Sequence, residues 1–163
     1  MVPPIADQTL LAQNSRLRQA VAIGTVSGGR ETNPLWTSQV SQADFAAALR
    51  QSLATHAMLT INNEAFRLEA TLHDLEQPIA GFDLQVTSRV SYRLVRASDG
   101  TTAYATEIRR AYTAPFSSSF LAVERLRLAN EGAIRENIRE FLSVLIAEEA
   151  RNPAAFGGQA RMS

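Results

Sequence analysis

The feature that most limits the fold is a period-two alternation of apolar and polar residues in three stretches of the chain. Apolar residues from Phe66 to Leu72 alternate with charged and polar ones, and the pattern returns between residues 82 and 94 and between residues 104 and 112. Such alternation is typical of strands that bury one face and expose the other to water. We therefore expect three long strands that share an apolar face.

The turn between the last two of these strands can be tested against their patterns. A two-residue Asp99-Gly100 loop would place Tyr92 opposite Glu107 and mix the two faces, which a half-buried sheet does not allow. A three-residue loop that begins at Ser98, with Gly100 in the left-handed conformation, avoids this conflict. It pairs residues of like character: Leu94 with Tyr104, Tyr92 with Thr106, Val90 with Ile108, and Val86 with Tyr112.

Two helices and one further strand complete the expected elements. Ser41 can cap a helix, with Asp44 three residues later as in a capping box, and apolar residues then recur at helical spacing to about His56. A longer helix is predicted over residues 118–149, where apolar positions form one broad stripe. The short apolar run at residues 20–26 is a candidate strand.

Because each element has one apolar face, the expected fold places both helices on the same face of the sheet. This is a two-layer α+β sandwich with the order β-α-β-β-β-α and a largely antiparallel sheet of about four strands. Proline and glycine near the two ends predict a linker over residues 1–19 and a flexible tail over residues 150–163. The single domain is then expected at residues 20–149.

Composition excludes several classes of function. All 16 basic residues are arginines and they are balanced by 16 acidic residues, which argues against strong attraction to nucleic acid. The chain contains no cysteine, so it cannot form disulfides, cysteine-based zinc sites or a thiol nucleophile. No apolar run approaches the roughly 20 residues that span a bilayer as a helix.

Catalytic motifs are not found. The two histidines, His56 and His73, do not form a metal-binding spacing, and no serine lies in a nucleophile-elbow motif. His56 is expected near the end of the first helix. His73 lies beside Asp74, so it is either a base oriented by a carboxylate or a solvated side chain, and no nucleophile is implied. We predict neither enzyme activity nor a metal or cofactor.

The outer, polar face of the predicted sheet is the first candidate site. The register places Arg89 directly opposite Arg109, an unfavourable pair unless an acid or an anion lies between them. One interpretation is a solvated face balanced by Glu107 and Glu69. The other is a docking face for a partner carboxylate or a lipid phosphate, which suits the bidentate geometry of arginine. The residues proposed to form this site are Arg67, Arg89, Arg93, Arg109 and Glu107.

Two further candidates are buried amides and an aromatic loop. Asn130 and Asn137 fall near the centre of the long helix's apolar stripe, where an unpaired amide costs roughly 1–3 kcal/mol. They are expected to bond to loop backbone or to the other helix, or else to face a ligand. The loop that contains Asn33 and Trp36, the only tryptophan, is either a recognition element or a plug at the edge of the core.

Four stretches of the sequence form a familiar pattern: Gly28-Gly29 to Asn33-Pro34-Leu35-Trp36, Phe45 to Leu53, Val90-Ser91-Tyr92-Arg93-Leu94, and Arg125-Leu126-Arg127-Leu128-Ala129-Asn130-Glu131-Gly132-Ala133. Together they resemble a family of small proteobacterial cell-envelope lipoproteins, over about residues 20–146. The order of elements expected in this chain is also similar to that of the lipopolysaccharide-assembly lipoprotein. Some members of the first family are labelled UDP-N-acetylglucosamine acyltransferases, an activity whose well-known form uses hexapeptide repeats that this chain lacks.

The resemblance implies a periplasmic domain anchored to the outer membrane through an acylated cysteine upstream of Met1. It also implies a non-enzymatic binding or scaffold role in envelope or lipopolysaccharide assembly, with an envelope protein or a lipid as partner. Another interpretation is a small carrier that holds an apolar ligand between helices and sheet, and an enzyme of envelope lipid metabolism is the third. A carrier would have a cavity lined by Leu53, Tyr92, Tyr104 and Phe141.

Overall fold

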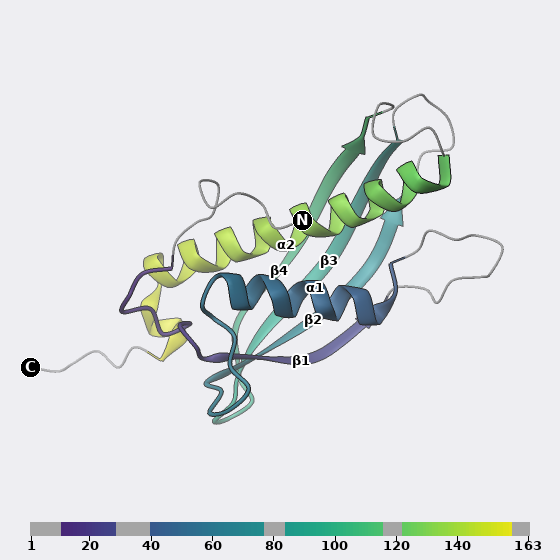
Figure 1. Ribbon diagram of the computed structural model, residues 1–163. Helices are drawn as coiled ribbons and strands as arrows, with labels where there is room; N and C mark the ends of the chain where they lie inside the picture. The colour runs from purple at the N-terminus through teal and green to yellow at the C-terminus, as the bar shows by residue number, and fades with distance from the viewer. Residues whose placement is uncertain (1–10, 29–39, 77–83, 116–121, 158–163) are drawn as a thin grey trace, which may run out of the picture.

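A computed structural model describes residues 11–28, 40–76, 84–115 and 122–157 (Figure 1). It confirms the α+β fold and the predicted order of elements. The helices and strands are β1 (Val21–Gly28), α1 (Gln42–Thr55), β2 (Phe66–Glu76), β3 (Leu84–Arg96), β4 (Thr102–Ala114) and α2 (Ala122–Arg151), followed by the 3₁₀ helix η3 (Pro153–Phe156).

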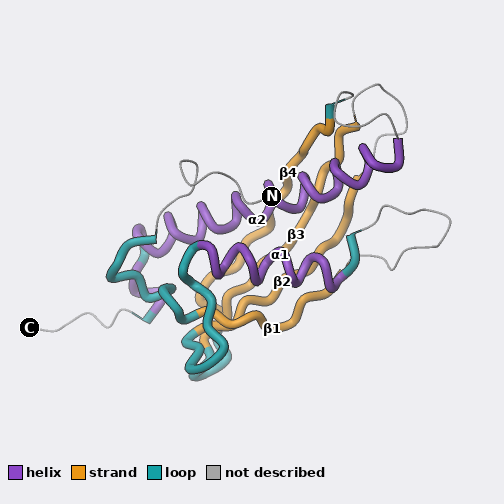
Figure 2. Tube along the Cα trace, viewed as in Figure 1, coloured by secondary structure: helices purple, strands orange, loops and turns teal. Residues whose placement is uncertain are grey.

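The strands form one sheet in the order β1-β2-β3-β4, with both helices on one face. β1 runs parallel to β2, and the other neighbouring strands are antiparallel. Figure 2 shows α1 and α2 lying across the same side of the strands. The core lies between these two layers, and it is built from the apolar faces that alternation predicts on β2 and β3. Among the described residues, no helix or strand covers the opposite face of the sheet, and its side chains are exposed or partly exposed.

The register between β3 and β4 confirms the prediction, although the turn is one residue longer than expected. Leu94 pairs with Tyr104, and the other three predicted pairs are also present. The loop is closed by Arg96, whose amide donates to the Thr101 carbonyl at 2.8 Å, and Gly100 has a φ of 71°. The register then shifts by one residue beyond Leu94. This bulge in β4 absorbs the extra residue, so the apolar faces remain aligned.

The start of α1 follows the sequence prediction closely. The Ser41 hydroxyl accepts a hydrogen bond from the amide of Asp44 at 3.1 Å, as an N-cap should. The helix ends at His56, whose ring nitrogen Nδ1 lies 2.8 Å from the carbonyl oxygen of Ser52. The side chain of His56 therefore contacts the backbone at the end of its own helix.

A bulge in β2 changes which side chains reach the open face of the sheet. The register shifts between Leu72, which pairs with Val90, and Asp74, which pairs with Arg89. His73 is the extra residue, so His73 and Asp74 follow one another on the same side. The next partly buried apolar residue is Leu75, three positions after Leu72. This change of spacing from two to three is the sequence signal of the bulge.

Residues beyond both predicted domain boundaries belong to the core. Leu17, placed in the linker, is fully buried, and the neighbouring Ser15 hydroxyl donates to Glu149 at 2.6 Å. Phe156, placed in the tail, is 2% exposed, and its ring meets that of Phe66 edge-on at 6.1 Å. Composition predicted loops at these ends, but single apolar residues in them pack into the main core cluster.

α2 lies close to β4 because a glycine faces the strand. A Cβ atom added at Gly132 would come within 2.2 Å of the Tyr112 ring. Buried Ala129 and Ala133, one turn of helix apart, pack in the same small cluster. These small residues allow the helix to approach the sheet and bring its polar side chains within hydrogen-bonding distance of the strands.

Candidate functional site

The open side of the sheet, which we call the outer face, carries a ladder of ion pairs. Each predicted arginine of this face lies near an acid of the same chain. The pairs are Arg67 with Glu64 at 3.4 Å, Arg89 with Asp74 at 2.5 Å, Arg93 with Glu69 at 3.7 Å, and Arg109 with Glu76 at 2.8 Å. Because the arginine side chains are 44–63% exposed, such pairs contribute little to stability. They instead give the surface an alternating pattern of charge.

Arg89 lies directly opposite Arg109, as the predicted register requires. Two acids balance the repulsion between the two positive charges. Asp74 and Glu76 supply the balancing charges, whereas the sequence suggested Glu107 and Glu69. The bulge at His73 explains the difference, because it turns Asp74 toward Arg89. The hydrogen bond to Asp74 raises the pKa of Arg89.

A shallow hollow lies in the middle of the outer face. Its volume is about 520 Å³, and it is wide open to solvent. Charged and hydroxyl side chains of β2 and β3 form its sides, and β4 contributes small residues. The lining residues are Glu69, Thr71, Ser91, Tyr92, Arg93, Ala105 and Thr106. The hollow brings Glu69 and Arg93, but not Arg89 or Arg109, into one concave patch.

A chain of hydrogen bonds crosses the outer face from His73. Its ring nitrogen Nε2 lies 2.7 Å from the hydroxyl of Ser91, which donates to Glu107 at 3.4 Å. The sequence implied no nucleophile near His73, whereas the structure places the Ser91 hydroxyl beside its ring. However, a serine that donates to a carboxylate accepts its hydrogen bond from the imidazole. That direction is the reverse of what activates a nucleophile.

A buried polar network joins α2 to β3 and β4. The side-chain oxygen of Asn137 accepts a hydrogen bond from the Tyr92 hydroxyl at 2.8 Å. Its amide nitrogen donates to the Ser88 hydroxyl at 3.0 Å and to the Ile108 carbonyl at 2.8 Å. Ser88, also fully buried, donates in turn to the carbonyl of Ala133 at 3.0 Å.

This network corrects the expected partners of Asn137, which lie in the sheet and not in a loop or the other helix. Asn130 is buried as predicted, at 1% exposure. Sequence reasoning missed Ser88, although its place among the apolar positions of β3, between Val86 and Val90, was a usable signal. The Tyr92 hydroxyl, the Ser88 hydroxyl and the Ile108 carbonyl bond to the amide of Asn137, so this side chain attaches α2 to the sheet.

The residues expected to line a carrier cavity pack against one another. The rings of Tyr92 and Phe141 are stacked, with centroids 4.0 Å apart and an interplanar angle of 8°. Leu53 is fully buried in the same cluster, against which partly buried Tyr104 packs. Where these side chains meet, the space between helices and sheet is filled by protein.

Burial raises the pKa of Tyr92 well above its usual range. In the unfolded chain this tyrosine loses its proton near pH 10, whereas in the folded protein it keeps it. The unfolded state then binds fewer protons, so stability falls as pH rises above about 10. We expect denaturant titrations between pH 8 and 11 to show that the stability difference between wild type and Tyr92→Phe shrinks above pH 10. A difference that stays constant over this range would contradict the burial of an un-ionised Tyr92.

The two loop residues proposed as a recognition element cannot be placed relative to the outer face. Asn33 and Trp36 lie outside the described residues. Among the residues that the structure does describe, no group of three or more potential ligands could hold a metal ion. Within the same ranges, no helix is long and apolar enough to cross a membrane.

Comparisons with known proteins identify the fold. No family model matches the chain, and no curated protein matches it in sequence. Among solved structures, a protein of Xanthomonas campestris with the family label DUF330 is similar, with a TM-score of 0.61 and 11% identity. The match covers 90% of this chain and 97% of that protein.

Two further structures share the architecture. A protein of Caulobacter crescentus described as a lipoprotein has a TM-score of 0.54 and 17% identity, covering 80% of this chain and 91% of its own. PelC from Paraburkholderia phytofirmans, described as a dodecamer, has a TM-score of 0.54 and 14% identity, covering 83% and 93%. At these identities the likeness shows the fold: this chain has an α+β fold that also occurs in bacterial lipoproteins.

Proposed function

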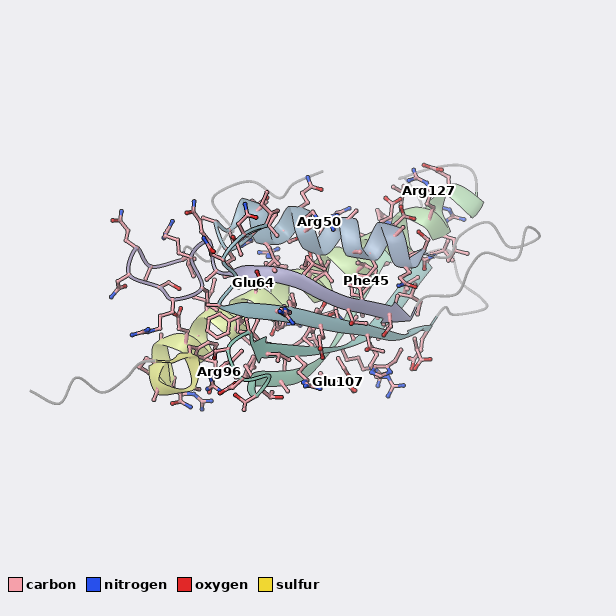
Figure 3. All side chains as sticks on the ribbon, turned by 90° about the horizontal axis from the view of Figure 1, so that it is seen from below. Phe45, Arg50, Glu64, Arg96, Glu107 and Arg127 are labelled. Atoms are coloured by element: carbon pink, nitrogen blue, oxygen red, sulfur yellow. The ribbon has the colours of Figure 1, made fainter. Side chains whose placement is uncertain are left out.

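We propose that this chain is the folded domain of a bacterial cell-envelope lipoprotein that works by binding an envelope protein through its outer face. The observation that carries the proposal is the ladder of alternating charges on an open sheet whose other face is covered by both helices. Figure 3 views the layers from the side, with Arg50 on the helix side and Glu107 on the opposite side. The shared fold of the Caulobacter protein supports the lipoprotein assignment.

The chemistry of the outer face favours a protein over a phosphate-rich surface. Four arginines of the sheet, at positions 67, 89, 93 and 109, are accompanied by four acids on the same strands: Glu69, Asp74, Glu76 and Glu107. Because positive and negative charges are balanced, this face has no strongly positive electrostatic potential that would attract lipid headgroups. It can, however, match a complementary pattern of charges, which gives specificity in protein interfaces. Lipopolysaccharide as the partner would instead require arginines released from their acids.

The filled core disfavours the carrier function. Stacking of Tyr92 on Phe141 and the hydrogen bond from Tyr92 to Asn137 hold helix and sheet together where an apolar ligand would enter. A ligand there would have to break both contacts. The open outer face needs no such rearrangement to bind a partner.

Catalysis at Ser91 is disfavoured by its surroundings. Ser91 lies on β3, an inner strand whose backbone is paired with β2 on one side and β4 on the other. A hydrolase needs backbone or side-chain donors aimed at a developing oxyanion. In a paired inner strand the amide groups point along the sheet to neighbouring strands, so they do not point at a substrate above the face.

Affinity purification of the native full-length protein from its own membranes tests the proposal. We expect an envelope protein to co-purify with wild type and to be lost with the double variant Arg89→Glu and Arg93→Glu, which inverts charge at the centre of the outer face. Glu107 and Arg109 on β4 remain unchanged in this variant. The matched control is Arg50→Glu, on the solvent side of α1. Bound proteins and lipids are identified together by mass spectrometry.

The outcomes separate the candidate functions. A protein retained by Arg50→Glu but lost from the double variant supports the outer face. A lipid held equally by wild type and both variants supports the carrier. If wild type brings down neither protein nor lipid, both binding functions are contradicted. Incorporation of labelled palmitate into the native product tests the lipoprotein assignment separately.

A further inference from the structure

β4 is a long strand at the edge of the sheet. It extends from Thr102 to Ala114, and in the described part of the chain it pairs only with β3. Proteins usually protect such edges with proline, lysine, bulges or short strands. β4 has one bulge, next to its start, and no proline or lysine. Ten residues from Tyr104 to Thr113 therefore present a regular backbone edge.

The direction of the free backbone groups follows from contacts with β3. Ser88 lies directly opposite Arg110, and its hydroxyl oxygen lies 3.2 Å from the Arg110 carbonyl oxygen. The Arg110 carbonyl therefore points toward β3. Backbone groups alternate along an antiparallel strand, so those of Glu107, Arg109 and Ala111 point away from β3. No other described strand pairs with these amides and carbonyls, which point toward the position of a further strand.

The side chains of β4 are complementary to β4 itself. If a second copy pairs antiparallel with Ile108 at the two-fold axis, Glu107 of each copy lies opposite Arg109 of the other. Ala105 then faces Ala111, and Tyr104 faces Tyr112. Opposite charges in directly opposed positions stabilise a sheet, and isologous contacts of this kind close a dimer.

Neighbouring registers lack this match. Moving the axis to Glu107 places two glutamates opposite each other, and moving it to Arg109 places two arginines opposite each other. Both arrangements are destabilising. If the axis lies between two neighbouring residues, residues of the buried face are placed opposite residues of the outer face, which is also unfavourable. The charge pattern therefore selects one register.

We propose that β4 is a self-association edge through which two copies of this chain form a continuous eight-stranded sheet. The second copy is favoured over another strand because Glu107 and Arg109 satisfy each other across the axis. Arg109 would then lie between Glu76 of its own chain and Glu107 of the second copy. On the helix side, Arg110 is drawn to Glu140 of α2 at 2.5 Å, which keeps its charge away from the edge. The proposal is independent of the binding function of the outer face.

Charge exchange at the edge tests this pairing. In sedimentation velocity experiments on the full chain at 1–100 μM, we expect wild type to form a dimer. Glu107→Arg places like charges opposite each other twice, so the dissociation constant should rise at least tenfold. The double variant Glu107→Arg and Arg109→Glu restores opposite charges and should recover the dimer. The Arg89→Glu variant, on the next strand, is the matched control and should dimerise like wild type.

Disulfide trapping tests the register. The chain has no cysteine, so Ala105→Cys and Ala111→Cys can be introduced into a clean background. Mixed single variants treated with oxidised glutathione should form a covalent heterodimer, whereas each variant alone should not, because like positions are far apart in this register. A monomer at every concentration, a double variant that stays monomeric, or equal trapping by Ala105→Cys alone would overturn the proposal. Circular dichroism of each variant confirms that loss of the dimer is not loss of the fold.

Discussion

Asn137→Leu is expected to lower the free energy of unfolding by about 3 kcal/mol, because it removes the centre of the buried network without removing its partners. The Tyr92 hydroxyl loses its acceptor, and the Ser88 hydroxyl and the Ile108 carbonyl lose a donor. Leucine has a similar size, so the effect comes from unpaired polar groups and not from a cavity. Chemical denaturation followed by circular dichroism measures the change.

A double-mutant cycle separates the hydrogen bond from the packing. Tyr92→Phe removes the hydroxyl and leaves the stacked ring in place. We expect Tyr92→Phe to lower the free energy of unfolding much less in the Asn137→Leu background than in wild type, since the hydroxyl there is already unpaired. Additive effects of the two substitutions would show that Tyr92 and Asn137 do not interact.

Phe141→Ala is expected to have the largest effect of any single substitution considered, about 3–5 kcal/mol. Phe141 is fully buried and its ring stacks on Tyr92 at 4.0 Å, so its removal leaves a cavity between α2 and the sheet. For a domain of this size, each kcal/mol corresponds to roughly 2–4 °C in melting temperature. Calorimetry of the wild type and the variant measures the loss.

The same substitution distinguishes a filled core from a ligand site. Phe141→Leu keeps most of the volume and should cost clearly less than Phe141→Ala. In a carrier, trimming a residue that lines the cavity would change ligand binding and leave stability almost unaltered. A loss under 1 kcal/mol for Phe141→Ala would therefore contradict the packed interface.

The strands and their register were predictable because one face of each is buried. The identities of Val90, Tyr92 and Leu94 admit only one alignment with β4, and the structure has it. The loop differed by one residue because a bulge near the turn changes loop length without changing the faces. Patterns of side chains define the register of a strand body better than the geometry of its turn.

The candidate site was predicted only in part. Arg89 and Arg109 were placed correctly, but their partners Asp74 and Glu76 were missed, because the bulge at His73 shifts the second half of β2 by one residue. Period-two reasoning cannot assign a face beyond an unrecognised bulge. The interval of three between Leu72 and Leu75 would have revealed it.

The partners of Asn137 could not be predicted from the sequence, because they depend on where α2 crosses the sheet. The helical pattern showed that Asn137 is buried, and it gave no information on which strand lies beneath it. The close approach at Gly132 and the hydroxyl of Ser88 determine that crossing. The burial of Phe156 was missed for a similar reason, since one apolar residue carries no periodicity.

Site-specific photo-crosslinking in cells tests most directly whether the outer face is the binding surface. A photoreactive amino acid is placed at Gln85, exposed on β3, and in parallel at Ala47 and Arg50, exposed on α1. We expect adducts with an envelope protein from Gln85 and none with that protein from the two α1 positions. Adducts from α1 with none from Gln85 would contradict binding through the outer face and would place the binding surface on the helix layer.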